Sequence, residues 1–169
     1  MINVLFVCHG NICRSPMAEF IFKDLVNKNG LSKDFYIKSA ATSYEEIGND
    51  IYYLAKEKLE EKNIPINKRK ATRITLDDYQ KYDFILGMEE ANIRNIERII
   101  GNDSEHKIKK LLDYSNNPHD IADPWYTGNF EIAYKDILEG CMDFLNYLIN
   151  KHIIWNFFIF HLYIYMKAG

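Results

Sequence analysis

The chain alternates between short continuous apolar runs and longer segments with apolar residues at helical spacing. The continuous runs predict strands over residues 2–7, 35–40 and 83–88, and a weaker one over 108–112. Helical spacing predicts helices over 16–29, 51–62, 76–80, 89–100 and 130–150. Strands that alternate with helices imply right-handed crossovers. The sequence therefore predicts a single-domain α/β fold, a four-stranded parallel sheet with helices on both faces in the three-layer flavodoxin-like or Rossmann-like arrangement.

Local signals mark several of the helix ends. Thr75 precedes the short helix as a candidate N-cap, and Pro16 fits the first turn of the helix that follows it. Gly30 and Gly101 each follow the last periodic residue of a predicted helix, where glycine commonly ends it.

The predicted topology also indicates where a ligand would bind. In open parallel sheets, ligands bind beyond the carboxyl ends of the strands. Cys8 directly follows the first predicted strand, and the loops 41–50 and 114–129 follow the second and fourth. We therefore expect these three segments to border one site.

Composition narrows the function classes. With 169 residues the chain has the size of about one domain, and its net charge of −3 with scattered Lys and Arg argues against a nucleic-acid partner. Three cysteines do not form a disulfide framework, and Met1 leads into a strand without a signal peptide. We expect a cytoplasmic protein.

The first strand is followed by a segment suited to binding a phosphoryl group. A loop between a strand and a helix gathers backbone N–H groups and positive helix-dipole charge, which favour a reactive thiolate. Gly10 and Asn11 tolerate positive φ, Arg14 offers a planar fork to two oxygens, and Ser15 can donate to the sulfur. The expected phosphate-binding residues are His9, Gly10, Asn11, Ile12, Cys13, Arg14 and Ser15, with Cys8 as the nucleophile.

This segment resembles the signature of the low-molecular-weight protein tyrosine phosphatases. In that family the cysteine attacks phosphorus, the arginine binds the equatorial oxygens, and an aspartate in an Asp-Pro pair protonates the leaving group. The resemblance implies Cys8, Arg14 and Asp123 as catalytic residues, a phosphocysteine intermediate, and no metal or cofactor. Asp-Pro by itself is a common turn, so Asp123 gains its role from the loop upstream. Its carboxylate can afterwards activate the water that hydrolyses the intermediate.

The resemblance also suggests the substrate. In the family, the aromatic residues after Asp-Pro form a wall for the substrate's phenyl ring, which implies Trp125 and Tyr126 as cleft residues. Tyr44 occupies the place of the other wall, or it is a surface tyrosine; Glu45 and Glu46 beside it would influence which peptides approach. The expected substrate is a phosphotyrosine-containing protein or a small aryl phosphate, and the product is inorganic phosphate.

Two further positions carry alternatives. Cys13 either forms a disulfide with Cys8 after oxidation, as the family's reversible protection does, or fills space beneath the loop. Asn11 and Ser15 join a hydrogen-bond network in the family that includes a histidine. Arg69 stands at the matching position here, so the sequence leaves the rear anchor of the loop open.

The resemblance ends near residue 151, which predicts a phosphatase domain over 1–151 and an extension over 152–169. Residues 152–166 are almost wholly apolar and aromatic, yet shorter than the ~20 residues that a membrane span needs. We expect an oligomer contact or docked tail; the alternatives are an added strand, a contact with a membrane interface, or an extension without function.

Three other functions fit the same loop. A phosphoarginine phosphatase related to this family has threonine where this chain has Ile12. Arsenate reductases of related fold need further cysteines, and Leu86 to Met88 contains none. A phosphate-binding module without turnover would need neither Cys8 nor Asp123.

Overall fold

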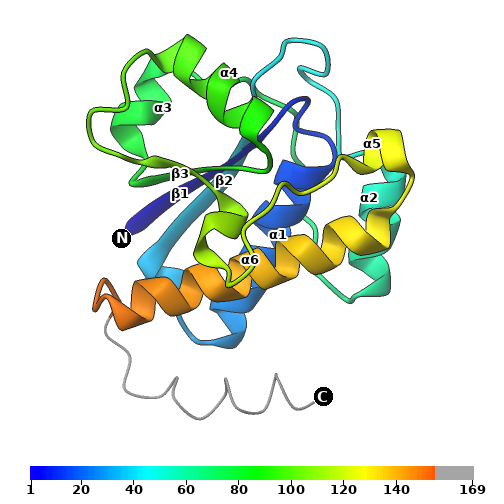
Figure 1. Cartoon of the computed structure of the whole chain (residues 1–169). Helices are drawn as coiled ribbons and strands as arrows, with labels where there is room; N and C mark the ends of the chain where they lie inside the picture. The colour runs from blue at the N-terminus through cyan, green and yellow to red at the C-terminus, as the bar shows by residue number, and fades with distance from the viewer. Residues whose placement is uncertain (155–169) are drawn as a thin grey trace.

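The computed structural model describes residues 1–154, and these form a parallel sheet between two layers of helices (Figure 1). The strands are β1 (Ile2–Cys8), β2 (Phe35–Ala41), β3 (Phe84–Gly87) and β4 (Ile108–Lys110). They lie in the order β2-β1-β3-β4, and every neighbouring pair is parallel. The predicted single-domain α/β fold with a four-stranded parallel sheet is confirmed.

Helices cover both faces of the sheet. α1 (Arg14–Lys28) packs against α6 (Phe130–Asn150) on one side, and α3 (Leu76–Lys81) packs against α4 (Glu90–Ile100) on the other (Figure 1). α2 (Tyr53–Glu61) contacts α1 and α6. The remaining elements are the short helix α5 (Pro124–Thr127) and two 3-10 turns, η1 (Ser32–Asp34) and η2 (Leu111–Tyr114).

The position of β1 at the centre of the sheet explains why its sequence is apolar without alternation. Val4 and Phe6 belong to the core on the α1 and α6 side, whereas Leu5 and Val7 belong to the core on the α3 and α4 side. All four side chains are at most 2% exposed. Both faces of this strand are thus buried, as expected for the centre of a parallel sheet.

Two predicted boundaries differ from the structure. The fourth strand ends at Lys110, because the Asp113 carboxylate accepts a hydrogen bond from the Lys110 backbone N–H and closes the turn η2. The first helix begins at Arg14, before the predicted Pro16. The predicted N-cap Thr75 is confirmed: its hydroxyl accepts from the Asp78 N–H, and the Asp78 carboxylate accepts from the Thr75 N–H.

The strand register brings the three predicted site segments to one edge. Cys8 pairs with Ala41, Val7 with Gly87, and Gly87 with Lys110, so all four strands end at nearly the same level. The loops that leave these carboxyl ends border the same edge of the sheet. This is the place where ligands bind in open sheets of this type.

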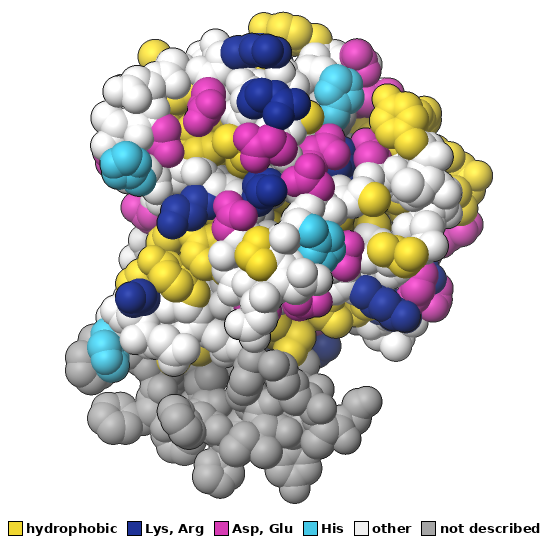
Figure 2. Space-filling model, viewed as in Figure 1, with side chains coloured by type: hydrophobic (Ala, Val, Ile, Leu, Met, Phe, Trp, Pro, Cys, Tyr) yellow, Lys and Arg dark blue, Asp and Glu magenta, His cyan; other side chains and the backbone are white. Residues whose placement is uncertain are grey.

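The surface does not show a large basic area on the visible face, where Lys and Arg side chains are interspersed with Asp and Glu (Figure 2). Within residues 1–154 no helix combines the length and the apolar character needed to cross a bilayer.

The contact predicted for residues 152–169 lies mostly outside the described residues. Of that run, Ile154 is 6% exposed and joins the core beneath α1 and α6.

The close approach of α6 to η2 depends on Gly140. A Cβ atom at this position would lie 2.6 Å from Cγ of Leu111, which is fully buried. Gly140→Ala should therefore destabilise the protein by about 1 kcal/mol, since an overpacking cost of about 2 kcal/mol exceeds the helix propensity gained, about 1 kcal/mol. Urea unfolding measures the change. Glu139→Ala, at the exposed neighbouring position, is the control; a Gly140→Ala protein as stable as the wild type would contradict the packing argument.

Candidate active site

The thiol of Cys8 lies at the end of β1, 3% exposed, inside the loop that joins β1 to α1. The Asn11 backbone N–H donates to its Sγ at 3.3 Å, and the Ser15 hydroxyl lies 3.0 Å from the same sulfur. Asn11 has φ of +58°, as the sequence predicted, and this left-handed backbone directs its N–H inward. A thiolate at Cys8 is therefore surrounded by hydrogen-bond donors, which stabilise its negative charge.

Positive φ does not explain the glycine at position 10, because Gly10 is not among the residues with positive φ. A Cβ on Gly10 would lie 3.3 Å from Cγ of Glu46, so glycine lets the loop 42–52 pack closely against the loop at Cys8. The backbone reinforces this contact, because the N–H groups of Thr42 and Ser43 donate to the carbonyls of Cys8 and His9.

Asn11 and Ser15 form a network behind the sulfur. The Asn11 side-chain amide donates to Ser15 Oγ at 2.8 Å. Its oxygen Oδ1 accepts from the Arg69 guanidinium and, at 3.2 Å, from the Thr72 N–H. Arg69 therefore contacts the loop from behind, at the point that the sequence left open. It does not simply face solvent.

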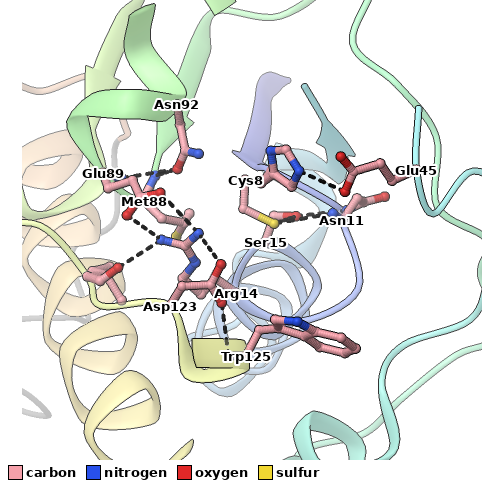
Figure 3. Close-up of polar contacts among 12 residues, drawn as sticks. Cys8, Asn11, Arg14, Ser15, Glu45, Met88, Glu89, Asn92, Asp123 and Trp125 are labelled. Carbon is pink, nitrogen blue, oxygen red and sulfur yellow. Dashed lines mark hydrogen bonds and ion pairs between the residues drawn. The ribbon is translucent and has the colours of Figure 1, made fainter. Parts of the chain in front are cut away.

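The Arg14 guanidinium is the most strongly bound cation at the site, and its residue is only 1% exposed. Its nitrogens donate to the Ile121 carbonyl at 2.9 Å and to Asp123 Oδ2 at 2.8 Å, and Glu89 pairs with it at 3.1 Å (Figure 3). Burial opposes its charge, but attraction to Cys8, Glu89 and Asp123 raises the pKa of Arg14 above its ordinary value. Arg14 is thus positively charged at any working pH.

Glu89 was not predicted as a site residue. It is the N-cap of α4, directly after the β3 edge, and its carboxylate contacts Arg14 through both oxygens. The Asn92 side chain holds this corner by accepting from the N–H groups of Met88 and Glu89. A single glutamate after an apolar strand forms no distinctive sequence pattern. Only its place at the carboxyl end of a strand could have indicated that Glu89 belongs to the site.

Asp123 both caps a turn and points into the site. Its Oδ1 accepts from the Trp125 N–H at 3.1 Å as N-cap of α5, and Pro124 occupies the first helical position. Its Oδ2 contacts Arg14. The turn therefore fixes the carboxylate and does not compete with a role in the site.

These groups enclose a cavity of about 120 Å³. It is bordered by nearly all of the predicted site residues, and by the carboxylates of Glu45 and Glu46 in addition. The lining comprises Cys8, His9, Gly10, Ile12, Cys13, Arg14, Glu45, Glu46, Asp123, Trp125 and Tyr126. Asn11 and Ser15 lie behind this lining and make the contacts described above.

Aromatic rings stand on one side of the cavity. Trp125 and Tyr126 are 53% and 83% exposed, and the Tyr52 ring lies 4.9 Å from that of Trp125, centroid to centroid. Tyr44 does not line this cavity. Its ring lies 4.2 Å from the Arg73 guanidinium and is 72% exposed. Glu45 and Glu46, the next two residues in the chain, line the cavity in place of the expected aromatic residue.

Two more loop residues are defined by their surroundings. His9 Nε2 lies 3.0 Å from Glu45 Oε2 at the mouth of the cavity, where both side chains are largely exposed (Figure 3). Cys13 is a buried free thiol. Burial raises the pKa of Cys13 above its ordinary value, and the nearby charges of Cys8 and Asp123 add to this, so Cys13 stays protonated. Within residues 1–154 no cluster of side chains is suited to hold a metal ion.

Comparison with known proteins identifies relatives over almost the whole described chain. The family model for low molecular weight phosphotyrosine protein phosphatase matches residues 3–153. The low molecular weight protein-tyrosine-phosphatase YfkJ of Bacillus subtilis is 40% identical over 147 residues, 86% of this chain and 94% of YfkJ. The human low molecular weight phosphotyrosine protein phosphatase is 38% identical over 148 residues, 85% of this chain and 93% of the human protein.

Solved structures agree with the sequence relatives. The crystal structure of YfkJ superposes with a TM-score of 0.86 at 38% identity, over 89% of this chain and 96% of that one. The structure of DARP, the drosophila arginine phosphatase, superposes with a TM-score of 0.78 at 32% identity, over 85% of this chain and 96% of that one. The fold, the extent of the match and the identities agree: the chain belongs to the low-molecular-weight phosphotyrosine protein phosphatase family.

Proposed function

We propose that this protein is a phosphotyrosine-protein phosphatase, which hydrolyses aryl phosphate monoesters through a phosphocysteine intermediate. The observation that carries the proposal is the arrangement of Cys8, Arg14 and Asp123 around one cavity. A nucleophile, an anion-binding cation and a carboxyl group are the three parts that this reaction needs. The relatives named above include YfkJ and the human enzyme, both named for action on phosphotyrosine.

In the first step the Cys8 thiolate attacks phosphorus, and the bond from phosphorus to the phenolic oxygen breaks. Arg14 and the N–H groups of the loop bind the three equatorial oxygens, whose charge spreads in the transition state. Asp123 donates its proton to the leaving oxygen, so that a neutral phenol departs. Phosphate must replace Asp123 as a partner of Arg14, which frees the carboxyl group for this role.

In the second step water attacks the phosphocysteine. Asp123, now ionised, takes a proton from that water, and the Cys8 thiolate leaves as inorganic phosphate forms. Ser15 and the Asn11 N–H lie within 3.0 and 3.3 Å of the sulfur, so they stabilise its negative charge before attack and after departure. Glu89 keeps Arg14 in position through both steps, because its ion pair does not depend on Asp123.

The side walls of the cavity support an aryl substrate. Trp125 and Tyr126 can cover a phenyl ring, and the Cys8 sulfur lies buried below them. A phosphotyrosine-containing protein or a small aryl phosphate would thus reach the sulfur. Phosphoserine is too short to use both the ring wall and the nucleophile.

We assign residues 1–151 to the phosphatase domain and 152–169 to an extension, and we propose a cytoplasmic location. A disulfide between Cys8 and Cys13 after oxidation stays a prediction; both are free thiols here, and Cys13 borders the same cavity as Cys8.

The roles of Cys8 and Asp123 are tested by turnover of aryl phosphates with different leaving groups. Cys8→Ser should reduce turnover to the uncatalysed background. Asp123→Asn keeps an N-cap for α5 but lacks the proton, so kcat/KM, which reports the step in which the phenol leaves, should fall by about 10²–10⁴-fold with phenyl phosphate. The loss should be smaller with p-nitrophenyl phosphate, whose leaving group needs less protonation.

Asp120→Asn is the matched control, because Asp120 lies on the same loop and contacts Lys110 instead of the cavity. Equal losses with both leaving groups would refute Asp123 as the acid. An inactive wild type that still binds phosphate would favour a binding module, and arsenate-dependent consumption of thiols would favour a reductase.

Phosphoarginine is the alternative substrate to be compared directly, since the relative DARP is an arginine phosphatase. With Ile12 bordering the cavity, we expect kcat/KM to be higher for a phosphotyrosine peptide than for the same peptide with phosphoarginine. Parallel phosphate-release assays measure the ratio, and a ratio below one would replace the proposed substrate.

Glu45 and Glu46 should favour peptides with basic residues near the phosphotyrosine. Glu45→Lys should shift the ratio of kcat/KM between basic and acidic peptides about fivefold toward acidic ones, since an exposed ion pair contributes up to about 1 kcal/mol. Turnover of p-nitrophenyl phosphate should stay unchanged. Glu97→Lys, exposed on α4, is the control, and equal losses for peptides and small substrate would contradict the assignment.

A further inference from the structure

A second cavity of about 310 Å³ lies beside the edge strand β2 and behind the loop that holds Cys8. It shares no lining residue with the cavity above Cys8. Its wall combines residues of β2 with the segment that follows α2, and its charged and polar members include Lys38, Ser39, Lys68, Arg69, Lys70 and Tyr82.

Positive charge exceeds negative charge in this cavity, whose lining has four cations and two carboxylates. Its two carboxylates have other partners: Glu19 binds Lys23 and Ser39, each at 2.5 Å, and Asp78 binds Thr75 in the cap of α3. Among residues 1–154, none of the four cations that line the cavity forms an ion pair. They are Lys38, Lys68, Arg69 and Lys70.

Arg69 has a hydrogen-bond donor that is not used. One of its terminal nitrogens, Nη2, donates to Asn11, but Nη1 is buried without an acceptor. Burial lowers the pKa of Arg69 below its ordinary value, although the charges of Glu19, Cys8 and Asp50 attract the guanidinium. An anion next to this guanidinium would accept from the unused Nη1 donor.

From this arrangement we propose that the second cavity binds a small compound with two or more phosphate charges, such as diphosphate, and that its binding lowers turnover at Cys8. Lys and Arg make strong charge-assisted hydrogen bonds to phosphate oxygens. Lys68 and Lys70 are exposed and can close on a ligand, while Arg69 forms the inner wall.

The cavity is connected to the nucleophile by three consecutive hydrogen bonds. Arg69 donates to Asn11, the Asn11 amide donates to Ser15 at 2.8 Å, and the Ser15 hydroxyl lies 3.0 Å from the Cys8 sulfur. An anion bound at Nη1 pulls the guanidinium toward the cavity, which weakens the bond from Nη2 to Asn11 and loosens this network. Coupling between two sites typically amounts to about 5–150-fold in affinity, and it is reciprocal. The effect on turnover rests on the proposed function, whereas the binding does not.

Binding is tested by calorimetric titration of inorganic diphosphate. Wild type should bind two equivalents, one at each cavity. The double variant Lys68→Ala/Lys70→Ala should lose one of them, with affinity there at least about 10-fold lower. The variant Lys33→Ala/Lys56→Ala removes the same charge from exposed lysines elsewhere and should bind like wild type. A single equivalent in wild type, or unchanged binding by the Lys68/Lys70 variant, would overturn the site.

Coupling is tested with saturating p-nitrophenyl phosphate at constant ionic strength. Diphosphate at the second cavity should lower kcat by about fivefold or more, and Lys68→Ala/Lys70→Ala should abolish this effect with basal kcat unchanged. If diphosphate raises only KM, it acts at Cys8 alone and the coupling is refuted. A wild type without turnover would instead refute the proposed function, and the titration would still decide the second site.

Discussion

The structure of the site depends on keeping one arginine charged inside the protein. Arg14 is 1% exposed, and a buried guanidinium is tolerated only when its charge and donors are matched. Ile121, Glu89 and Asp123 provide this match, and they come from the end of β3 and the loop after β4. The same cation therefore fixes the start of α1, the cap of α4 and the acid-bearing loop. A bound phosphoryl group needs to displace only Asp123 from this arrangement.

The fold could be predicted largely from hydrophobic patterning, because β1 is buried on both faces and the helices each bury one face. The placement of Cys8 and Arg14 at one cavity was also predictable, since the two residues are close in sequence. Asp123 required the family resemblance, as spacing alone does not bring residues 8 and 123 together. Its ability to cap α5 and contact Arg14 at once became evident only in three dimensions.

The remaining site residues depend on tertiary contacts that have no local pattern. Glu89 reaches Arg14 because β3 ends beside β1. Gly10 was expected to tolerate positive φ, which it does not adopt; instead, the absence of a Cβ atom leaves room for the Glu46 side chain. Arg69 lies in a basic run that solvent could have surrounded, yet it binds Asn11. Tyr44 was expected either at the cleft or at the surface, and its exposed ring contacts the Arg73 guanidinium outside the cavity.

The contacts of Arg14 also bear on how the protein is made. Its partners lie 75, 107 and 109 residues further along the chain. During synthesis the loop with Cys8 leaves the ribosome early, while Glu89 follows 75 residues after Arg14 and Asp123 follows 109 residues after it, in a chain of 169. The nascent chain cannot complete the pocket until the acid-bearing loop emerges, and such long-range contacts slow folding. Assembly of the pocket around Arg14 is thus a late event in the biogenesis of this protein, and truncated chains lack it.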